Sequence, residues 1–174
     1  MVLEMKKEKL SPGMIFLGVL LWISFLGCLA VIIYLSVQDG EAAKALGKDY
    51  IRKGAEYYYG RNNFTADEMV DITYRFRQYG RILIFTVLGF LGTATFHLTF
   101  HRWWWIVRAI ISAGFLILVA VFTERYKIYL PTRHYSETEM IYSIMGAMAG
   151  FLLVSFITLL YSLIKKVSAL SKDS

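Results

Sequence analysis

The feature that most constrains the fold of this chain is a set of four apolar stretches, each about long enough to cross a bilayer as a helix. They cover approximately residues 14–37, 82–100, 103–123 and 140–164. A transmembrane helix needs about 20 predominantly apolar residues. Three of the stretches contain no charged residue, and the stretch at 103–123 contains only Arg108. We therefore predict an all-α membrane protein with four transmembrane helices in a single membrane domain, residues 1–174.

The composition supports a membrane protein. Hydrophobic residues make up 57% of the chain and charged residues 18%, whereas soluble domains have about 45–50% and about 25%. These values exclude an ordinary water-soluble enzyme and a disordered chain. The net charge of +6 is explained by basic segments that flank membrane helices, so we expect no nucleic acid partner.

The basic residues near the helix ends predict the orientation. Positive charge favours the cytoplasmic side, and four spans place both termini on one side. The basic residues that decide the side are Lys6, Lys7, Lys9, Arg102, Lys165, Lys166 and Lys172. Both termini are therefore expected in the cytoplasm. The stretch at 14–37 is too long for the core of a signal peptide, so we expect it to remain as an anchor.

The outer segment at about 38–80 has helical character of its own. Residues 40–59 are rich in Ala, Lys and Glu and end in Tyr57, Tyr58 and Tyr59. Thr65 followed by Glu68 forms a capping box, which predicts a helix that continues into the second span. The sequence leaves open whether this segment lies on the lipid headgroups or covers a ligand site.

The second outer loop carries many charges directly between two spans. Glu124 ends the third span and Glu139 begins the fourth, so both carboxylates can approach Arg81 or Arg133 if these helix ends are neighbours. One interpretation is an ion-pair clamp, because unpaired charges are costly at a low-dielectric boundary. The other is a site for a phosphate or lipid headgroup, because an arginine fork matches phosphate geometry.

Residues of this loop resemble a known family. Six positions fit the C-terminal motif of VanZ-like membrane proteins, acid-x-x-Gln-x-x-x-Pro-x-Arg-x-x-Ser-x-x-Asp-x-x-x-Asn-x-x-Gly. They are Glu124, Pro131, Arg133, Ser136, Glu139 and Gly146. Glu139 stands where the motif has Asp. Arg77, Leu88 and Gly89 keep positions of the family's other motif, Arg-Lys-x-x-His-x-x-x-Tyr-x-x-Leu-Gly. The resemblance covers about residues 77–150.

Three departures from these motifs bear on mechanism. Arg81 replaces the family's His, Lys127 replaces the Gln, and Ser143 replaces the Asn. Since the charge of an arginine is fixed at ordinary pH, a general acid or base, or a metal ligand, is excluded at position 81.

The resemblance implies a multi-pass protein of the bacterial cytoplasmic membrane. It is similar to the accessory proteins that raise tolerance to teicoplanin and related lipoglycopeptides. Lipid-linked wall precursors and the antibiotics that bind them are found at the outer face of this membrane. The residues carried over, all expected at that face, are Arg77, Glu124, Pro131, Arg133, Ser136 and Glu139.

Three functions stay open. In a non-enzymatic binder, Arg77, Arg81 and Arg133 would hold the phosphate of an anionic lipid or a lipid-linked wall precursor, with Glu124 and Glu139 orienting the arginines. In an interfacial transferase or hydrolase, Glu124 or Glu139 would act as a general base.

In a scaffold subunit, the small residues of the fourth span would form the interface. Gly146 and Gly150 form a GxxxG pattern, which lets helix backbones approach closely. We expect this pattern to pack inside the chain, with Gly89 and Gly92 opposite it. The oligomeric state stays open.

No cofactor or metal site is predicted. His97 and His101 lie four residues apart, but a histidine pair without a third ligand is typical of interfacial polarity rather than of a metal site.

Overall fold

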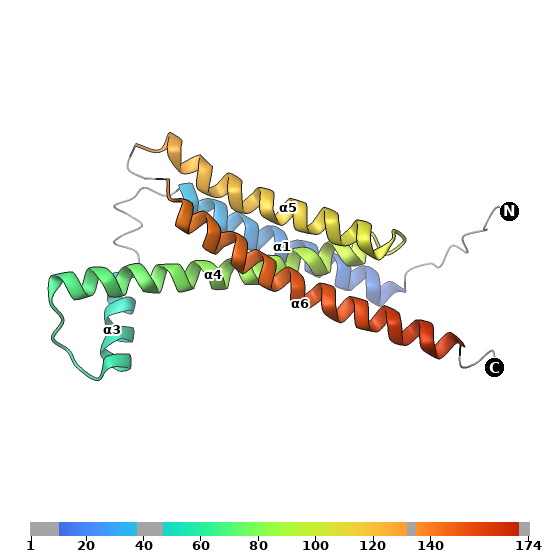
Figure 1. Cartoon of the computed structure of the whole chain (residues 1–174), viewed down its shortest axis with the longest axis horizontal. Helices are drawn as coiled ribbons and strands as arrows, with labels where there is room; N and C mark the ends of the chain where they lie inside the picture. The colour runs from blue at the N-terminus through green and yellow to red at the C-terminus, as the bar shows by residue number, and fades with distance from the viewer. Residues whose placement is uncertain (1–10, 38–46, 132–134, 171–174) are drawn as a thin grey trace.

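A computed structural model of the chain describes residues 11–37, 47–131 and 135–170 (Figure 1). Over these ranges the chain is helical and contains no strand. The elements are α1 (Pro12–Val37), α3 (Lys48–Tyr59), α4 (Ala66–Thr99), α5 (Trp105–Arg125), the 3-10 helix η1 (Tyr126–Tyr129) and α6 (Glu137–Leu170). Four helices are long and apolar enough to cross a membrane. The predicted fold class is therefore confirmed.

Helix α4 is longer than the span predicted for it. It has 34 residues and hence a length of about 51 Å, against a hydrocarbon core of about 30 Å. Its start is fixed by the predicted capping box: Thr65 Oγ1 accepts from the Glu68 N–H at 3.3 Å, and the Glu68 carboxylate accepts from the Thr65 N–H at 2.9 Å. The predicted continuity of this outer helix with the second span is confirmed.

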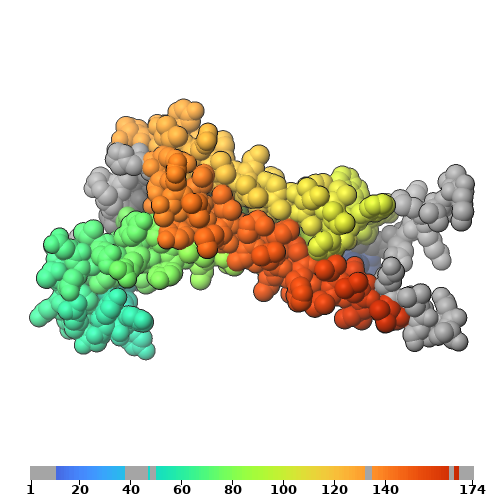
Figure 2. Space-filling view, in the orientation of Figure 1, coloured from blue at the N-terminus to red at the C-terminus, as the bar shows by residue number. Residues whose placement is uncertain are grey.

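Helix α3 packs on the first part of α4. Ile51 and Ala55 are buried, Gly54 lies next to Phe76, and Tyr57 is exposed. The predicted helical segment at 40–59 is observed from Lys48 onward, and residues 38–46 lie outside the described ranges. In the space-filling view, α3 and the first turns of α4 form a lobe apart from the end of α5 (Figure 2).

The four long helices alternate in direction. Helices α1 and α5 run one way and helices α4 and α6 run the other way (Figure 1). The start of α1 and the end of α6 consequently lie at one end of the molecule, together with the α4–α5 connection that contains Trp103. We call this the Trp103 end. We call the opposite end, where α5 ends and α6 begins, the α3 end.

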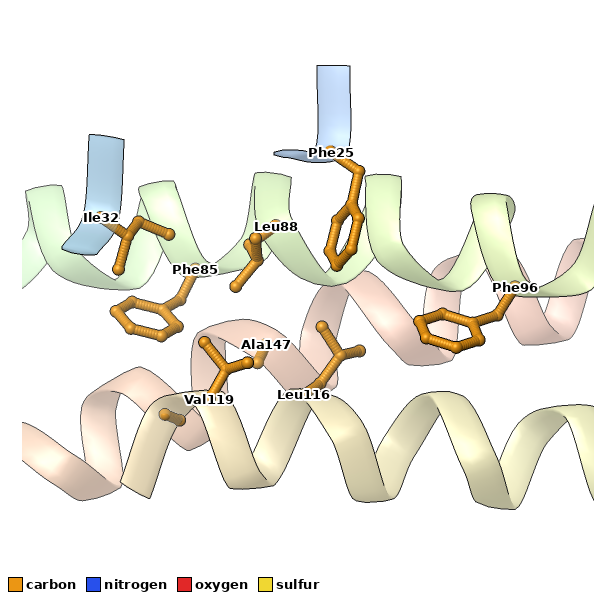
Figure 3. Close-up of a cluster of buried hydrophobic side chains, with 9 residues drawn as sticks. Phe25, Ile32, Phe85, Leu88, Phe96, Leu116, Val119 and Ala147 are labelled. Carbon is orange, nitrogen blue, oxygen red and sulfur yellow. The ribbon is translucent and has the colours of Figure 1, made fainter. Parts of the chain in front are cut away.

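All four long helices contribute to one apolar core (Figure 3). Its buried members are Phe25 and Ile32 of α1, Phe85, Leu88 and Phe96 of α4, Leu116, Val119 and Ala120 of α5, and Ala147 of α6. Many large apolar side chains elsewhere on these helices remain exposed, such as Phe16, Leu118 and Phe156. Such a surface suits a protein whose outward faces contact lipid.

Glycines bring α4 and α6 into backbone contact. A Cβ at Gly150 would collide with the Thr86 carbonyl oxygen and the Phe90 nitrogen, and a Cβ at Gly89 would collide with the Ala147 carbonyl oxygen. The glycine pair of α6 therefore packs against α4 of the same chain. Gly146 lies against Ile82 and Phe85 of α4.

Gly92 was expected to face the glycine pair of α6, but it does not. Its nearest neighbours are Phe25 of α1 and Leu116 of α5. The difference arises because Gly92 lies three residues after Gly89, on a part of the helix surface that points toward the other two helices.

The α4–α6 contact predicts that a Gly→Ala substitution changes stability differently at two positions. Gly150→Ala should lower the free energy of unfolding by about 1–3 kcal/mol, since the added methyl group forces the backbones apart. Gly114→Ala in α5 has no atom within 4 Å of its new Cβ and should be neutral or slightly stabilising, because Ala favours helix. Thermal unfolding in detergent, followed by circular dichroism, measures both. Equal melting temperatures for the two variants would contradict close α4–α6 packing.

Candidate functional site

Four charged side chains meet at the α3 end of the bundle. Arg81 of α4 donates from Nη1 to Glu124 Oε2 of α5 at 2.7 Å and from Nη2 to Glu139 Oε2 of α6 at 2.6 Å. Lys127 of η1 donates from Nζ to Glu124 Oε2 at 2.7 Å and to Glu139 Oε2 at 2.8 Å. Each cation thus contacts both carboxylates. We call these four residues the charge cluster.

The charge cluster is neutral and largely buried. The side chains of Glu124 and Lys127 are 2% and 4% exposed, and those of Arg81 and Glu139 are 21% and 25% exposed. Removing a charge from water costs several kcal/mol unless a partner compensates it. Two cations and two carboxylates compensate each other here. Glu139 forms the more open side of the cluster, and Glu124 the closed side.

Local structure positions the carboxylates. Glu124 lies in the last turn of α5, and the 3-10 turn that follows brings Lys127 back over it at a spacing of three residues. Ser136 precedes α6, and its Oγ accepts from the Glu139 N–H at 3.4 Å. This arrangement is typical of a helix N-cap. Ser136 therefore orients the first turn of α6, and with it Glu139.

Gln78 lies one turn before Arg81 and adds a neutral contact to the charge cluster. Its side chain lies beside the Glu139 carboxylate. Its Oε1 atom, in contrast, is buried and has no hydrogen-bond partner among the described residues. Such an acceptor is suited to a hydroxyl or water donor.

The structure brings together some of the residues named from the sequence. Arg81, Glu124 and Glu139 are in contact, and Ser136 lies beside them. Arg77 and Pro131 are exposed. Arg133 lies outside the described residues. Lys127 was missed as a contact residue, although it occupies a position of the resembling motif; its replacement of Gln by a cation was the available signal.

The tyrosine-rich helix does not cover the charge cluster. Tyr57 and Tyr58 of α3 are largely exposed, and α3 lies at the N-terminal end of α4, beyond the end of α5 (Figure 1). The described part of this segment, Lys48–Tyr59, therefore lies apart from the charge cluster (Figure 1). The reason is that α4 begins at Ala66, several turns before Arg81, and α3 packs on these first turns, away from the other long helices.

The geometry suits ion pairing better than acid–base catalysis. A general base needs a free lone pair directed at a substrate proton. Both carboxylates of the charge cluster instead accept hydrogen bonds from two cations. No group of three or more His, Cys, Asp or Glu side chains that could hold a metal ion occurs in the part of the chain that the structure describes.

Comparisons with protein-family models, with curated proteins and with solved structures gave no match. Of the residues that carry the resemblance to VanZ-like proteins, Glu124 and Glu139 belong to the charge cluster, whose two cations, Arg81 and Lys127, stand where the motifs have His and Gln.

Removing one buried cation should destabilise the bundle. In Lys127→Met, Glu124 keeps only Arg81 as a partner and the cluster has an excess negative charge. We expect a loss of about 3–5 kcal/mol of stability. Arg125→Met, an exposed neighbour in the same segment, is the control and should change stability little. Unfolding by denaturant in mixed micelles measures both losses.

A second substitution separates charge from packing. Adding Glu139→Gln to Lys127→Met restores neutrality and should recover part of the lost stability. If Lys127→Met were as stable as Arg125→Met, the charge cluster would not hold these helix ends together.

Proposed function

We propose that this chain is a VanZ-like, non-enzymatic protein of the bacterial cytoplasmic membrane. Its α3 end faces outward and binds the phosphate of an anionic lipid headgroup or of a lipid-linked wall precursor. Both termini are then cytoplasmic, in accord with the basic residues near the opposite end. Binding such a molecule would influence tolerance to teicoplanin and related lipoglycopeptides, which act at the outer face.

The observation that carries this proposal is the bridging position of Glu139. A single atom, Glu139 Oε2, accepts from Arg81 Nη2 at 2.6 Å and from Lys127 Nζ at 2.8 Å. A phosphate oxygen is bound by proteins in the same way, between a guanidinium and an ammonium group. The carboxylate of Glu139 thus occupies an anion position made by two cations.

Ligand binding would proceed by exchange at this position. Glu139 is the most exposed member of the charge cluster, so its carboxylate can turn toward water while a phosphate diester takes its place. One negative charge replaces another, and the buried charges stay balanced. Glu124 meanwhile keeps its contacts with Arg81 and Lys127 and holds both cations in place.

Gln78 supports a ligand with hydroxyl groups. Its buried Oε1 lacks a partner among the described residues, and its side chain already contacts Glu139. Headgroups that carry hydroxyls beside the phosphate, such as phosphatidylglycerol or a sugar-linked precursor, would supply the missing donor.

The alternative in which the charge cluster is only a clamp makes a different prediction. If the four charges serve stability alone, neutralising Glu139 weakens the bundle and leaves lipid binding unchanged. If Glu139 competes with a ligand, neutralising it frees Arg81 and Lys127 for that ligand.

Glu139→Gln should therefore retain more anionic lipid than the unchanged protein. We expect an increase of about tenfold or more in affinity for phosphatidylglycerol, since a charge-assisted hydrogen bond contributes about 1.5–3 kcal/mol. Native mass spectrometry of the protein extracted gently from membranes measures the retained lipid. Glu137→Gln is the control, because it removes the same charge from an exposed position in the same helical turn.

Two outcomes would decide against the proposal. One is equal retention by Glu139→Gln and Glu137→Gln in folded protein. The other is unchanged retention in Arg81→Lys, which keeps the charge but loses the guanidinium fork.

A further inference from the structure

A second polar cluster lies at the Trp103 end, inside the bundle. His97 in the last turn of α4 is 4% exposed. Arg108 of α5 donates from Nη1 to the His97 carbonyl oxygen at 3.2 Å. The ring of Trp105 lies 6.2 Å from the His97 ring, and its Nε1 donates to Thr158 Oγ1 of α6 at 3.2 Å. Three helices thus meet around His97.

Several buried polar atoms of this region have no partner among the residues that the structure describes. They are Nδ1 and Nε2 of His97, Nδ1 of His101, Nε of Arg108 and Oγ of Ser155. Buried polar atoms in folded proteins are almost always hydrogen-bonded, because an unpaired one costs free energy. Both nitrogens of a nearly fully buried imidazole are therefore available to an occupant.

No carboxylate of the described residues forms an ion pair with Arg108. The chain has no Asp or Glu between Arg81 and Thr123 or between Met140 and Leu170, and none in α1. The carbonyl end of α4 offers Arg108 only a partial negative charge of about half a unit. This differs from the α3 end, where two carboxylates balance two cations. Among the described residues no carboxylate supplies a full negative charge to Arg108, which leaves its guanidinium able to bind an anionic ligand.

The position of these residues relative to the membrane surface indicates what kind of anion can reach Arg108. Trp103 and Trp104 are exposed in the α4–α5 connection, and such tryptophans lie at the level of the lipid headgroups. Arg108 follows Trp105 by three residues of helix, which is a rise of about 4.5 Å. Its side chain is long enough to reach the phosphate level from there.

We propose that His97, His101 and Arg108 bind a phosphate group at the Trp103 end, supplied by a phospholipid of that leaflet. Arg108 donates from Nε to a phosphate oxygen, and the imidazole N–H of His97 donates to another. Ser155 Oγ and His101 Nδ1, which also lack a partner among the described residues, can accept or donate further hydrogen bonds. This site is separate from the charge cluster, so it does not depend on the function proposed for the α3 end.

Histidine signals test this site directly. The chain has 3 histidines, so NMR spectra of the full chain labelled with ¹⁵N at histidine, in detergent after delipidation, resolve His97 and His101. The protein is titrated with a short-chain phosphatidylglycerol and, separately, with inorganic phosphate. The lipid is expected to shift both signals in the unchanged protein.

Two arginine variants locate the phosphate. Arg108→Gln should need at least about tenfold more lipid for the same shift, since a charge-assisted contact is lost. Arg102→Gln removes an exposed arginine from the neighbouring connection and should respond like the unchanged protein.

The outcomes distinguish three cases: a site for a phospholipid, a site for free phosphate, and no phosphate site. Equal response to inorganic phosphate and to the lipid would assign the site to free phosphate. The proposal is overturned if neither compound shifts the two signals of the unchanged protein, a result that does not require any variant to fold. A response of Arg108→Gln equal to that of Arg102→Gln would overturn it as well.

Discussion

The burial of Glu124 is the constraint on which the α3 end of this protein depends. Its carboxylate is almost completely removed from solvent at the end of α5, and a buried charge persists only beside compensating groups. Arg81 and Lys127 supply these groups, and both of them also contact Glu139. One buried carboxylate thus links the end of α5 to η1, to the middle of α4 through Arg81 and to the start of α6 through the shared cations.

Local signals in the sequence predicted most of the fold. The four spans follow from apolar length, and the capping box at Thr65 and Glu68 correctly predicted where α4 starts. The membership of the charge cluster was harder to predict. Glu124 and Lys127 are neighbours along the chain, but the contacts of Arg81 with Glu124 and Glu139 cross 43 and 58 residues of sequence and depend on how the helices pack. The glycines show the same limit: Gly89 was expected opposite the glycine pair of α6 and lies there, whereas Gly92, expected beside it, faces Phe25 of α1 and Leu116 of α5.

The two ends of the bundle differ in how they balance charge. At the α3 end the protein supplies its own anions, and an external phosphate has to compete with Glu139. At the Trp103 end Arg108 and two histidines have no carboxylate nearby in the sequence, and several of their buried atoms are unpaired among the described residues. Between them, glycine contacts fix α4 against α6, so the two ends are held by one rigid pair of helices.

Solid-state NMR in lipid bilayers tests the central claim most directly. With ¹⁵N on the arginine and lysine side chains and ¹³C on the glutamate carboxyl groups, dipolar recoupling reports which charges are in contact. The structure predicts that the Glu124 carboxyl carbon correlates with the Arg81 guanidinium and with Lys127 Nζ, since both nitrogens lie 2.7 Å from Glu124 Oε2. A Glu124 carboxyl signal that correlates with neither cation would contradict a buried charge cluster at the ends of these helices.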